Sequence, residues 1–245
     1  MKNNIKLHIL SDYDAVSIKA AEIFASEVNR FPDSAFGFAT GGTPVGMYKE
    51  LVRLVAAGKL DLSKLTAFNL DEYYPIKADD DQSYAYFMAG NLFDPVNLPK
   101  ENRHIPKGEA NDPLAECKRY EELISNCGGI KLQILGLGLN GHIGFNEPAE
   151  SFSTCTNFVS LAPDTIEANS RFFASPDLVP KHAITMGIYS IMMAEKILLI
   201  ATGDGKAGIL KEALTGPITP KVPASVLQLH RDVVVVVCKE AGKFI

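Results

Sequence analysis

The chain has 245 residues, of which 47% are hydrophobic and 22% are charged, and its formal net charge is −5. This composition is that of a globular protein with a sizeable core, and it excludes an intrinsically disordered chain, a collagen-like repeat and a coiled coil. The acidic balance argues against a protein that binds nucleic acid or a membrane surface through a basic patch.

Short apolar runs alternate with segments of helical periodicity along most of the chain. Continuously apolar runs are typical of strands buried on both faces of a parallel sheet. The sequence therefore predicts an α/β fold: one domain with an open, mainly parallel sheet covered by helices on both faces. The predicted strands are residues 6–10, 35–39, 66–70, 130–135, 196–201 and 232–238. The predicted helices are one capped by Asp12 and residues 44–57, 79–93, 110–126, 187–195 and 206–214, while residues 149–180 are expected to be irregular.

Membrane, export and metal signals are missing from the sequence. No apolar stretch approaches the roughly 18 residues of a membrane-spanning helix, and the first residues do not form a signal peptide. The four cysteines form no CxxC motif and no zinc-ligand spacing with the five histidines. We therefore expect reduced thiols, a cytoplasmic location and no bound metal.

A glycine turn, TGGTP at residues 40–44, follows the second predicted strand. Thr43 suits the N-cap of the next helix, and Pro44 suits its first position. Free amides at a helix N-terminus bind anions, and glycines let a ligand approach the backbone closely. Gly41, Gly42 and Thr43 are therefore candidate phosphate-binding residues; an ordinary strand–helix turn is the alternative.

Two neighbouring carboxylates, Asp71 and Glu72, follow the third predicted strand. Because like charges at a strand end repel each other, the pKa of one carboxyl group can rise toward the range of a general base. A solvated acidic turn is the alternative.

The segment GLGLNG at residues 136–141 matches the GxGxxG pattern of dinucleotide-binding loops. That interpretation needs a helix to begin here and an acidic residue about 20 positions later, and Gly144 and Pro148 oppose such a helix. We therefore expect no nucleotide cofactor. The loop instead brings His142 near Glu147, and a carboxylate beside a histidine prepares it for proton transfer; a purely structural histidine is the alternative.

Two cations are candidate phosphate ligands. Arg171 lies in the irregular region and can bind a phosphate bidentately. Lys206 opens the helix after the fifth predicted strand, without the full GxxxxGK[ST] pattern of an NTPase loop. For each of them, taken alone, a surface cation is the favoured alternative. Lys181 and His182 are weaker candidates for lining the same cleft.

The chain contains, in order, the segments ATGGTP (39–44), FNLDEYY (68–74), LGLGLNGHIGFNEP (135–148), ANSRFF (168–173) and LQLH (227–230). Together they resemble the glucosamine-6-phosphate deaminase family, from about Leu7 to Cys238. The resemblance implies a three-layer α/β/α Rossmann-like fold. It also implies the conversion of glucosamine 6-phosphate to fructose 6-phosphate and ammonia, with no cofactor and no metal.

The resemblance also implies roles for the candidate residues. Some family members have Asp where this chain has Asn140, and because asparagine cannot ionise, Asn140 can act only by hydrogen bonding. His142, with Glu147 and Asn140, would open the sugar ring, and Asp71 would remove the C2 proton. Gly41, Gly42, Thr43, Arg171 and Lys206 would hold the phosphate, and residues 149–185 would form a lid over the sugar.

Two other functions share this fold. A 6-phosphogluconolactonase has a similar GGTP-like turn, but lactone hydrolysis needs no C2 base, so the DEYY and GHIGFNEP segments favour the deaminase. A sugar-phosphate sensor of a transcriptional regulator would need a DNA-binding segment, and the chain begins almost directly at its first predicted strand.

The resemblance also bears on regulation. Longer, hexameric family members bind the activator N-acetylglucosamine 6-phosphate between subunits, through an Arg and a Lys shortly after the FNEP segment. This chain has Asn157 and Val159 at the matching positions and stops at Ile245, before the C-terminal extension that contributes to that site. We therefore expect no activation and a monomer or small homo-oligomer.

Overall fold

The computed structural model describes residues 4–170, 173 and 175–245 and contains a seven-stranded sheet with the order β1-β10-β9-β6-β2-β3-β5. All neighbouring strands in it are parallel, which confirms the predicted sheet. The predicted strands agree with it to within one residue at each end; β5 had no prediction, because two residues carry no periodic signal. The strands are β1 (Ile5–Leu10), β2 (Ala35–Phe38), β3 (Thr66–Asn69), β5 (Arg103–His104), β6 (Ile130–Leu135), β9 (Lys196–Ala201) and β10 (Val233–Cys238).

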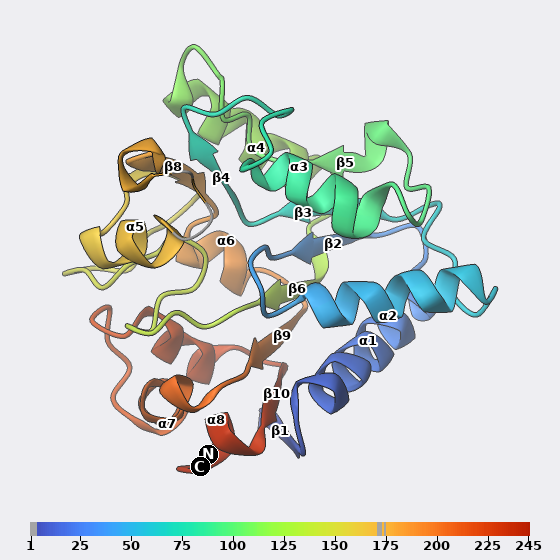
Figure 1. Cartoon of the computed structure of the whole chain (residues 1–245), viewed down its shortest axis with the longest axis vertical. Helices are drawn as coiled ribbons and strands as arrows, with labels where there is room; N and C mark the ends of the chain where they lie inside the picture. Colours follow the sequence, from blue (N-terminus) through green and yellow to red (C-terminus); the bar gives the residue numbers. More distant parts are fainter. Residues whose placement is uncertain (1–3, 171–172, 174) are drawn as a thin grey trace.

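Helices cover both faces of this sheet (Figure 1). The described residues contain the helices α1 (Tyr13–Arg30), α2 (Val45–Ala56), α3 (Tyr84–Met88), α4 (Pro113–Asn126), α5 (Pro163–Ser170), α6 (Ile188–Met192), α7 (Ala207–Thr215) and α8 (Lys239–Gly242), of which α5 lies beside the second sheet described below. On one face Phe38 packs against Phe24 of α1, with ring centroids 5.4 Å apart. On the other face Phe68 packs against Tyr120 of α4 at 5.8 Å. The fold is therefore the expected three-layer α/β/α arrangement.

A second sheet was not predicted. It contains β4 (Asp71–Tyr74), β8 (His182–Thr185) and β7 (Asn157–Ser160), all antiparallel. The expectation of an irregular segment at 149–180 is therefore wrong, since this segment contains β7 and α5. These strands are four residues long and pair across the chain, as Asp71 does with Thr185, so local periodicity carries little signal for them. A small core lies against this sheet, which we call the Tyr73 cluster: Tyr73, Ile76, Phe145, Leu161 and Ala183, with Tyr84, Val159, Ile166 and Phe173 packed on it.

The helix predicted at 79–93 begins later than expected. Its N-cap is Ser83, whose hydroxyl accepts a hydrogen bond from the amide of Tyr86. After α3 the chain continues as one π-helical turn, Ala89–Phe93. The amides of Tyr84 and Ala85 donate to the Glu72 carboxylate. With these acceptors the helix begins after Ser83, and residues 79–82 form a turn.

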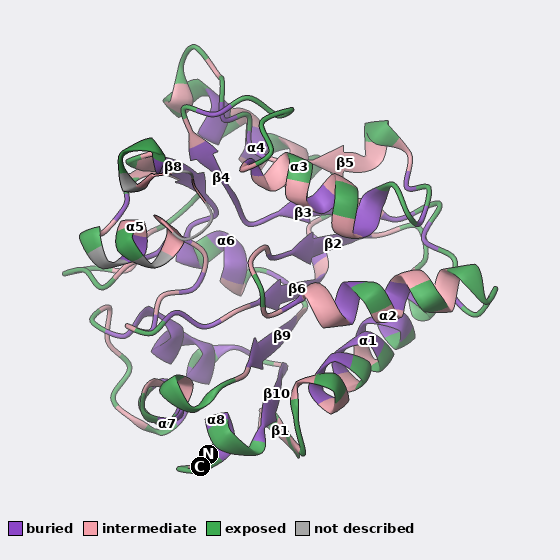
Figure 2. Ribbon diagram, viewed as in Figure 1, coloured by how far each residue is buried: buried purple, intermediate pink, exposed green. Residues whose placement is uncertain are grey.

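The main core follows the strands of the seven-stranded sheet, where buried residues concentrate (Figure 2). Every residue of β10 is buried, in keeping with a strand covered on both faces. Among the helices that the structure describes, none has the length and apolar character needed to cross a membrane.

Candidate active site

The chain changes direction in the middle of the seven-stranded sheet. From β2 it runs to β3 and β5 on one side, and it returns to β6 on the other side of β2. At such a switch point the loops after the strands diverge and leave a crevice. A cavity of about 600 Å³, which we call the switch-point cavity, lies here. Of the nine site residues predicted from the sequence, Gly41, Gly42, Thr43, Asp71, Asn140, His142 and Lys206 line it.

The glycine turn after β2 forms one wall of the cavity. Gly41 has a φ of +88°, a left-handed conformation that favours glycine. Among the described residues, no atom beyond those of the adjacent residues lies within 4 Å of the position that a Cβ would take at Gly41 or Gly42. The backbone of this turn is therefore open to a ligand.

The predicted capping of α2 is wrong in detail. Pro44 is the N-cap, and no side chain caps the helix. Instead the hydroxyl of Tyr13 accepts a hydrogen bond from the amide of Gly46 at 2.7 Å and donates one to the carbonyl of Gly42 at 3.1 Å. The amide within reach of a Thr43 cap is thus already satisfied by a residue of α1.

Asp71 begins β4 and is only 5% exposed. Its cross-strand partner Thr185 also hydrogen bonds to it. Burial, and then the negative charge of Glu72, raise the pKa of Asp71 to about 8. Asp71 is therefore a carboxyl group with the proton affinity of a general base that works near neutral pH.

Glu72 faces away from Asp71, because successive residues of a strand point to opposite faces. Its carboxylate accepts hydrogen bonds from the amides of Tyr73, Tyr84 and Ala85 at 2.9, 2.8 and 2.8 Å. These hydrogen bonds lower the pKa of Glu72, but burial outweighs them and raises it to about 7. The alternative of a solvated acidic turn is therefore wrong, since Glu72 is buried and holds the start of α3.

The residues after β6 form a loop, as expected, and the next element of the chain is β7. The imidazole of His142 lies against the backbone of Gly138. A Cβ atom at position 138 would come within 2.4 Å of Cε1 and Nε2 of His142. Nδ1 of His142 lies 3.3 Å from Oε2 of Glu147. Nδ2 of Asn140 donates a hydrogen bond to the same oxygen at 2.6 Å, and Oδ1 of Asn140 accepts one from the amide of His142 at 3.2 Å. The glycine pattern makes room here for an imidazole.

Glu147 is held by three side chains. Besides Asn140 and His142, the hydroxyl of Thr165 on α5 donates to its Oε1 atom. Burial raises the pKa of Glu147, but the hydrogen bond and charge of His142 and the hydrogen bonds from Thr165 and Asn140 outweigh it and lower the pKa to about 2. Glu147 is therefore a carboxylate, and Asn140 is a hydrogen-bond donor to it.

Lys206, the N-cap residue of α7, lines the cavity at the carboxyl end of β9. Arg171 lies outside the described residues. His182 stacks on Phe158 with ring centroids 5.0 Å apart, and neither it nor Lys181 lines the cavity. In the described part of the chain, no group of three or more His, Cys, Asp or Glu side chains is arranged to hold a metal ion.

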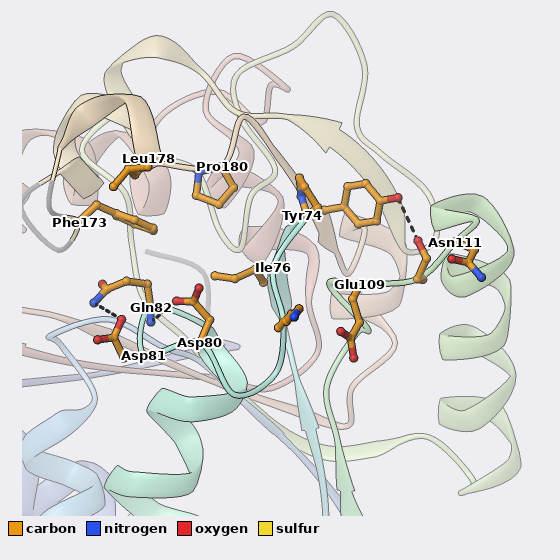
Figure 3. Close-up of a pocket in the computed structure, with 13 residues that line it drawn as sticks. Tyr74, Ile76, Asp80, Asp81, Gln82, Glu109, Asn111, Phe173, Leu178 and Pro180 are labelled. Carbon is orange, nitrogen blue, oxygen red and sulfur yellow. Dashed lines mark hydrogen bonds between the residues drawn. The ribbon is translucent and has the colours of Figure 1, made fainter.

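A second cavity, of about 860 Å³, lies around the end of β4 (Figure 3). Tyr74 and Phe173 line it together with the carboxylates of Asp80, Asp81 and Glu109. None of the predicted site residues that the structure describes lies in its wall. Chemistry by those residues therefore belongs to the switch-point cavity.

Two residues at the switch-point cavity carried no signal in the sequence. Tyr13 supports the glycine turn, and Thr165 holds Glu147. Neither belongs to a recognisable motif, and each lies 18 or more positions away from its partner. Only the folded chain brings them to the site.

A family model for glucosamine-6-phosphate isomerases and 6-phosphogluconolactonases matches residues 11–236. A glucosamine-6-phosphate deaminase from Clostridium perfringens (strain SM101) is 51% identical over 241 residues, which cover 98% of this chain and 100% of the relative. The structure also superposes on that of a monomeric glucosamine-6-phosphate deaminase with a TM-score of 0.95 and 42% identity, covering 98% of this chain and 100% of the other.

A 6-phosphogluconolactonase from Thermotoga maritima has the same fold, with a TM-score of 0.76 and 21% identity, covering 96% of this chain and 100% of the other. The family match contains the glycine turn, Asp71, the His142 loop and Lys206. The chain therefore belongs to the family of glucosamine-6-phosphate isomerases and 6-phosphogluconolactonases.

Proposed function

We propose that this protein is an enzyme that converts glucosamine 6-phosphate and water to fructose 6-phosphate and ammonia. The observation that carries the proposal is a buried carboxyl group of raised pKa, Asp71, that lines the same cavity as His142, whose ring pairs with Glu147 behind it. This reaction needs two proton-transfer groups, because the sugar ring must open before the C2 proton can be removed. The relative from Clostridium perfringens, 51% identical, is named for this reaction.

The histidine–carboxylate pair opens the ring. His142 takes the proton of the O1 hydroxyl and delivers a proton to O5, so that the pyranose becomes the open-chain aldehyde. Glu147 accepts a hydrogen bond from Nδ1 and stabilises the imidazolium formed between the two transfers. Asn140 keeps Glu147 in place without taking a proton itself.

Asp71 carries out the isomerisation. It removes the C2 proton, and the electron pair of the C2–H bond forms the C1=C2 bond of an enolamine while the aldehyde oxygen takes up a proton. Protonation at C1 then gives an imine at C2. Water adds to this carbon and nitrogen leaves as ammonia, which yields the ketone fructose 6-phosphate.

The pH dependence of the reaction should follow from the pKa of Asp71. A general base works only when ionised, and the pKa of Asp71 is raised to about 8. We expect kcat/KM to rise with pH and to reach half of its plateau well above the ordinary range of an aspartate, near about 8. A pH–rate profile at constant ionic strength measures this, and a plateau that already begins near pH 5 would contradict the assignment of Asp71 as the base.

The phosphate group would lie against Gly41, Gly42 and Thr43, with Lys206 and Arg171 supplying positive charge. Lys206→Ala and Arg171→Ala should each raise KM about tenfold or more, because each removes a charge-assisted hydrogen bond worth about 1.5–3 kcal/mol. Lys211→Ala is the control, since Lys211 is an exposed cation of α7 outside the cavity. Steady-state kinetics with an unchanged KM in both variants would mean that the phosphate binds elsewhere.

The segment 149–185 would act as a lid of this single-domain enzyme. Thr165 and Asn169, which line the cavity, belong to it, as do β7 and α5. α5 rests on the Tyr73 cluster through Ile166, whereas Phe152 packs on the main core and Thr156 hydrogen bonds to Glu121 of α4. The part of the segment around α5 can therefore move with the least disturbance of the main core.

The enzyme should follow hyperbolic kinetics without activation by N-acetylglucosamine 6-phosphate. Asn157 and Val159 stand where hexameric family members have the two cationic phosphate ligands, and a phosphate dianion without cations has little to offset its desolvation. The test is a titration with this compound at sub-saturating substrate. Sigmoidal substrate curves that become hyperbolic with the compound would contradict the prediction, whereas weak competitive inhibition agrees with it.

We expect the protein to be a monomer and to work in the cytoplasm. The deaminase of 42% identity is a monomer, and the cysteines Cys117, Cys127, Cys155 and Cys238 are all free thiols, as expected in a reducing compartment. Analytical ultracentrifugation of the purified protein should give the mass of one chain, 26.6 kDa, and a larger mass would contradict the monomer.

The proposed function is tested by measuring fructose 6-phosphate and ammonia released from glucosamine 6-phosphate. We expect both products in equal amounts. A parallel assay measures hydrolysis of 6-phosphogluconolactone. Lactone hydrolysis together with no release of ammonia from the amino sugar would contradict the proposal and identify a lactonase.

A further inference from the structure

We propose that Thr165 is a positioning residue for ring opening: its hydroxyl fixes the rotation of the Glu147 carboxylate so that Oε2 faces His142. This inference rests on the proposed function. It assigns a task to a residue of α5 that belongs to none of the segments discussed as motifs.

The two oxygens of Glu147 have separate partners. Oε2 accepts the hydrogen bond of Asn140 at 2.6 Å and lies 3.3 Å from Nδ1 of His142. Oε1 accepts the hydrogen bond of Thr165. The terminal torsion of a glutamate has broad minima, so one anchored oxygen alone does not fix the plane of the carboxylate. A second hydrogen bond, from Thr165 to Oε1, fixes this plane.

The hydrogen bond of Thr165 is shielded from water. Thr165 is 6% exposed, and the side chain of Glu147 is 15% exposed. Water therefore competes poorly for either group, and a buried hydroxyl without an acceptor would be costly. The contact is consequently stable whenever α5 lies on the cavity as it does in this structure.

Thr165 and Glu147 belong to different segments that meet at the Tyr73 cluster. Glu147 lies in the loop after β6, two residues after Phe145 of the cluster, and α5 rests on the same cluster through the neighbouring Ile166. The rotation of Glu147, and with it the orientation of the His142 ring, is therefore set by the position of α5. Ring opening is the only proposed step that uses this pair, so the effect should be specific to that step.

The test compares Thr165→Val, which removes the hydroxyl with little change of shape, with Thr165→Ser, which keeps it. Thr165→Val should lower kcat about tenfold or more, while Thr165→Ser should retain most of it. The inhibition constant of the reduced open-chain analogue, the 6-phosphate of 2-amino-2-deoxyglucitol, should stay within about twofold in both, because this compound needs no ring opening.

A spectroscopic signature separates positioning from general damage. The chain has five histidines, so the ring-proton NMR signals of His142 can be assigned by comparison with His142→Gln. These signals should shift in Thr165→Val and return to their original positions in Thr165→Ser. Thr215→Val is the matched control, because its hydroxyl donates to the carbonyl of Lys211 at the exposed end of α7, away from the cavity.

The outcomes separate this inference from the proposed function. Wild-type protein that releases no ammonia from glucosamine 6-phosphate would overturn the proposed function and the inference with it. Active wild-type protein with an unaffected Thr165→Val variant would overturn the inference alone, as would loss of analogue binding in Thr165→Val or failure of Thr165→Ser to restore kcat.

Discussion

Replacement of Asp71 by asparagine should lower turnover of glucosamine 6-phosphate by about 10²–10⁴-fold, the usual contribution of a general base. The asparagine side chain has nearly the same shape and can still hydrogen bond to Thr185, but it cannot take a proton at neutral pH. Exchange of the C2 proton with deuterated solvent should disappear together with turnover. Substrate binding should be retained, since the phosphate contacts are untouched.

The control for this change is Asp81→Asn. Asp81 is an exposed aspartate in the wall of the second cavity and takes no part in the switch-point cavity. It should leave turnover and C2 exchange unchanged. Turnover of Asp71→Asn within about tenfold of wild type would be too high for loss of a general base and would remove Asp71 from that role.

The stability of Asp71→Asn checks that the loss is chemical. The pKa of Asp71 in the folded protein, about 8, is above its unfolded value near 3.8. The folded state therefore favours the protonated form, and wild type loses stability as the pH rises from about 4 to about 8. Asparagine has no charge to bury, so the melting temperature of the variant relative to wild type should increase over the same interval. Thermal melts at pH 5 and pH 8 measure this.

Replacement of His142 by glutamine should also lower turnover by about 10²–10⁴-fold. Glutamine can hydrogen bond to Glu147 but cannot pass a proton from O1 to O5 near neutral pH. Because the loss lies in ring opening, binding of the reduced open-chain analogue should change little. Stopped assays for ammonia and inhibition by the analogue measure the two effects separately.

His182→Gln is the matched control for this second change. His182 lies in β8, stacks on Phe158 and is not part of the switch-point cavity. Its replacement should leave turnover near the wild-type value. An equal loss of turnover in both variants would show that the loss does not come from proton transfer at His142.

The sequence by itself determined the architecture of the main sheet and the position of most of the candidate site. Continuous apolar runs such as residues 196–201 and 232–238 identify buried parallel strands, and in such a sheet the residues that follow the strands gather at one edge. For this reason the glycine turn, Asp71, His142 and Lys206 could be expected at the same place. Their chemical roles came from a resemblance between motifs, not from the pattern of strands and helices.

The tertiary structure alone decided the details that make this edge a site. Asp71 and Glu72 look equivalent in the sequence, and only the pairing of β4 with β8 separates them: Asp71 lines the cavity, and Glu72 holds the start of α3. The contacts of Tyr13 with the glycine turn and of Thr165 with Glu147 join residues 18 or more positions apart. Local periodicity reports which face of an element is buried, but it carries no information on which distant side chain reaches that face, because this depends on how the elements pack together.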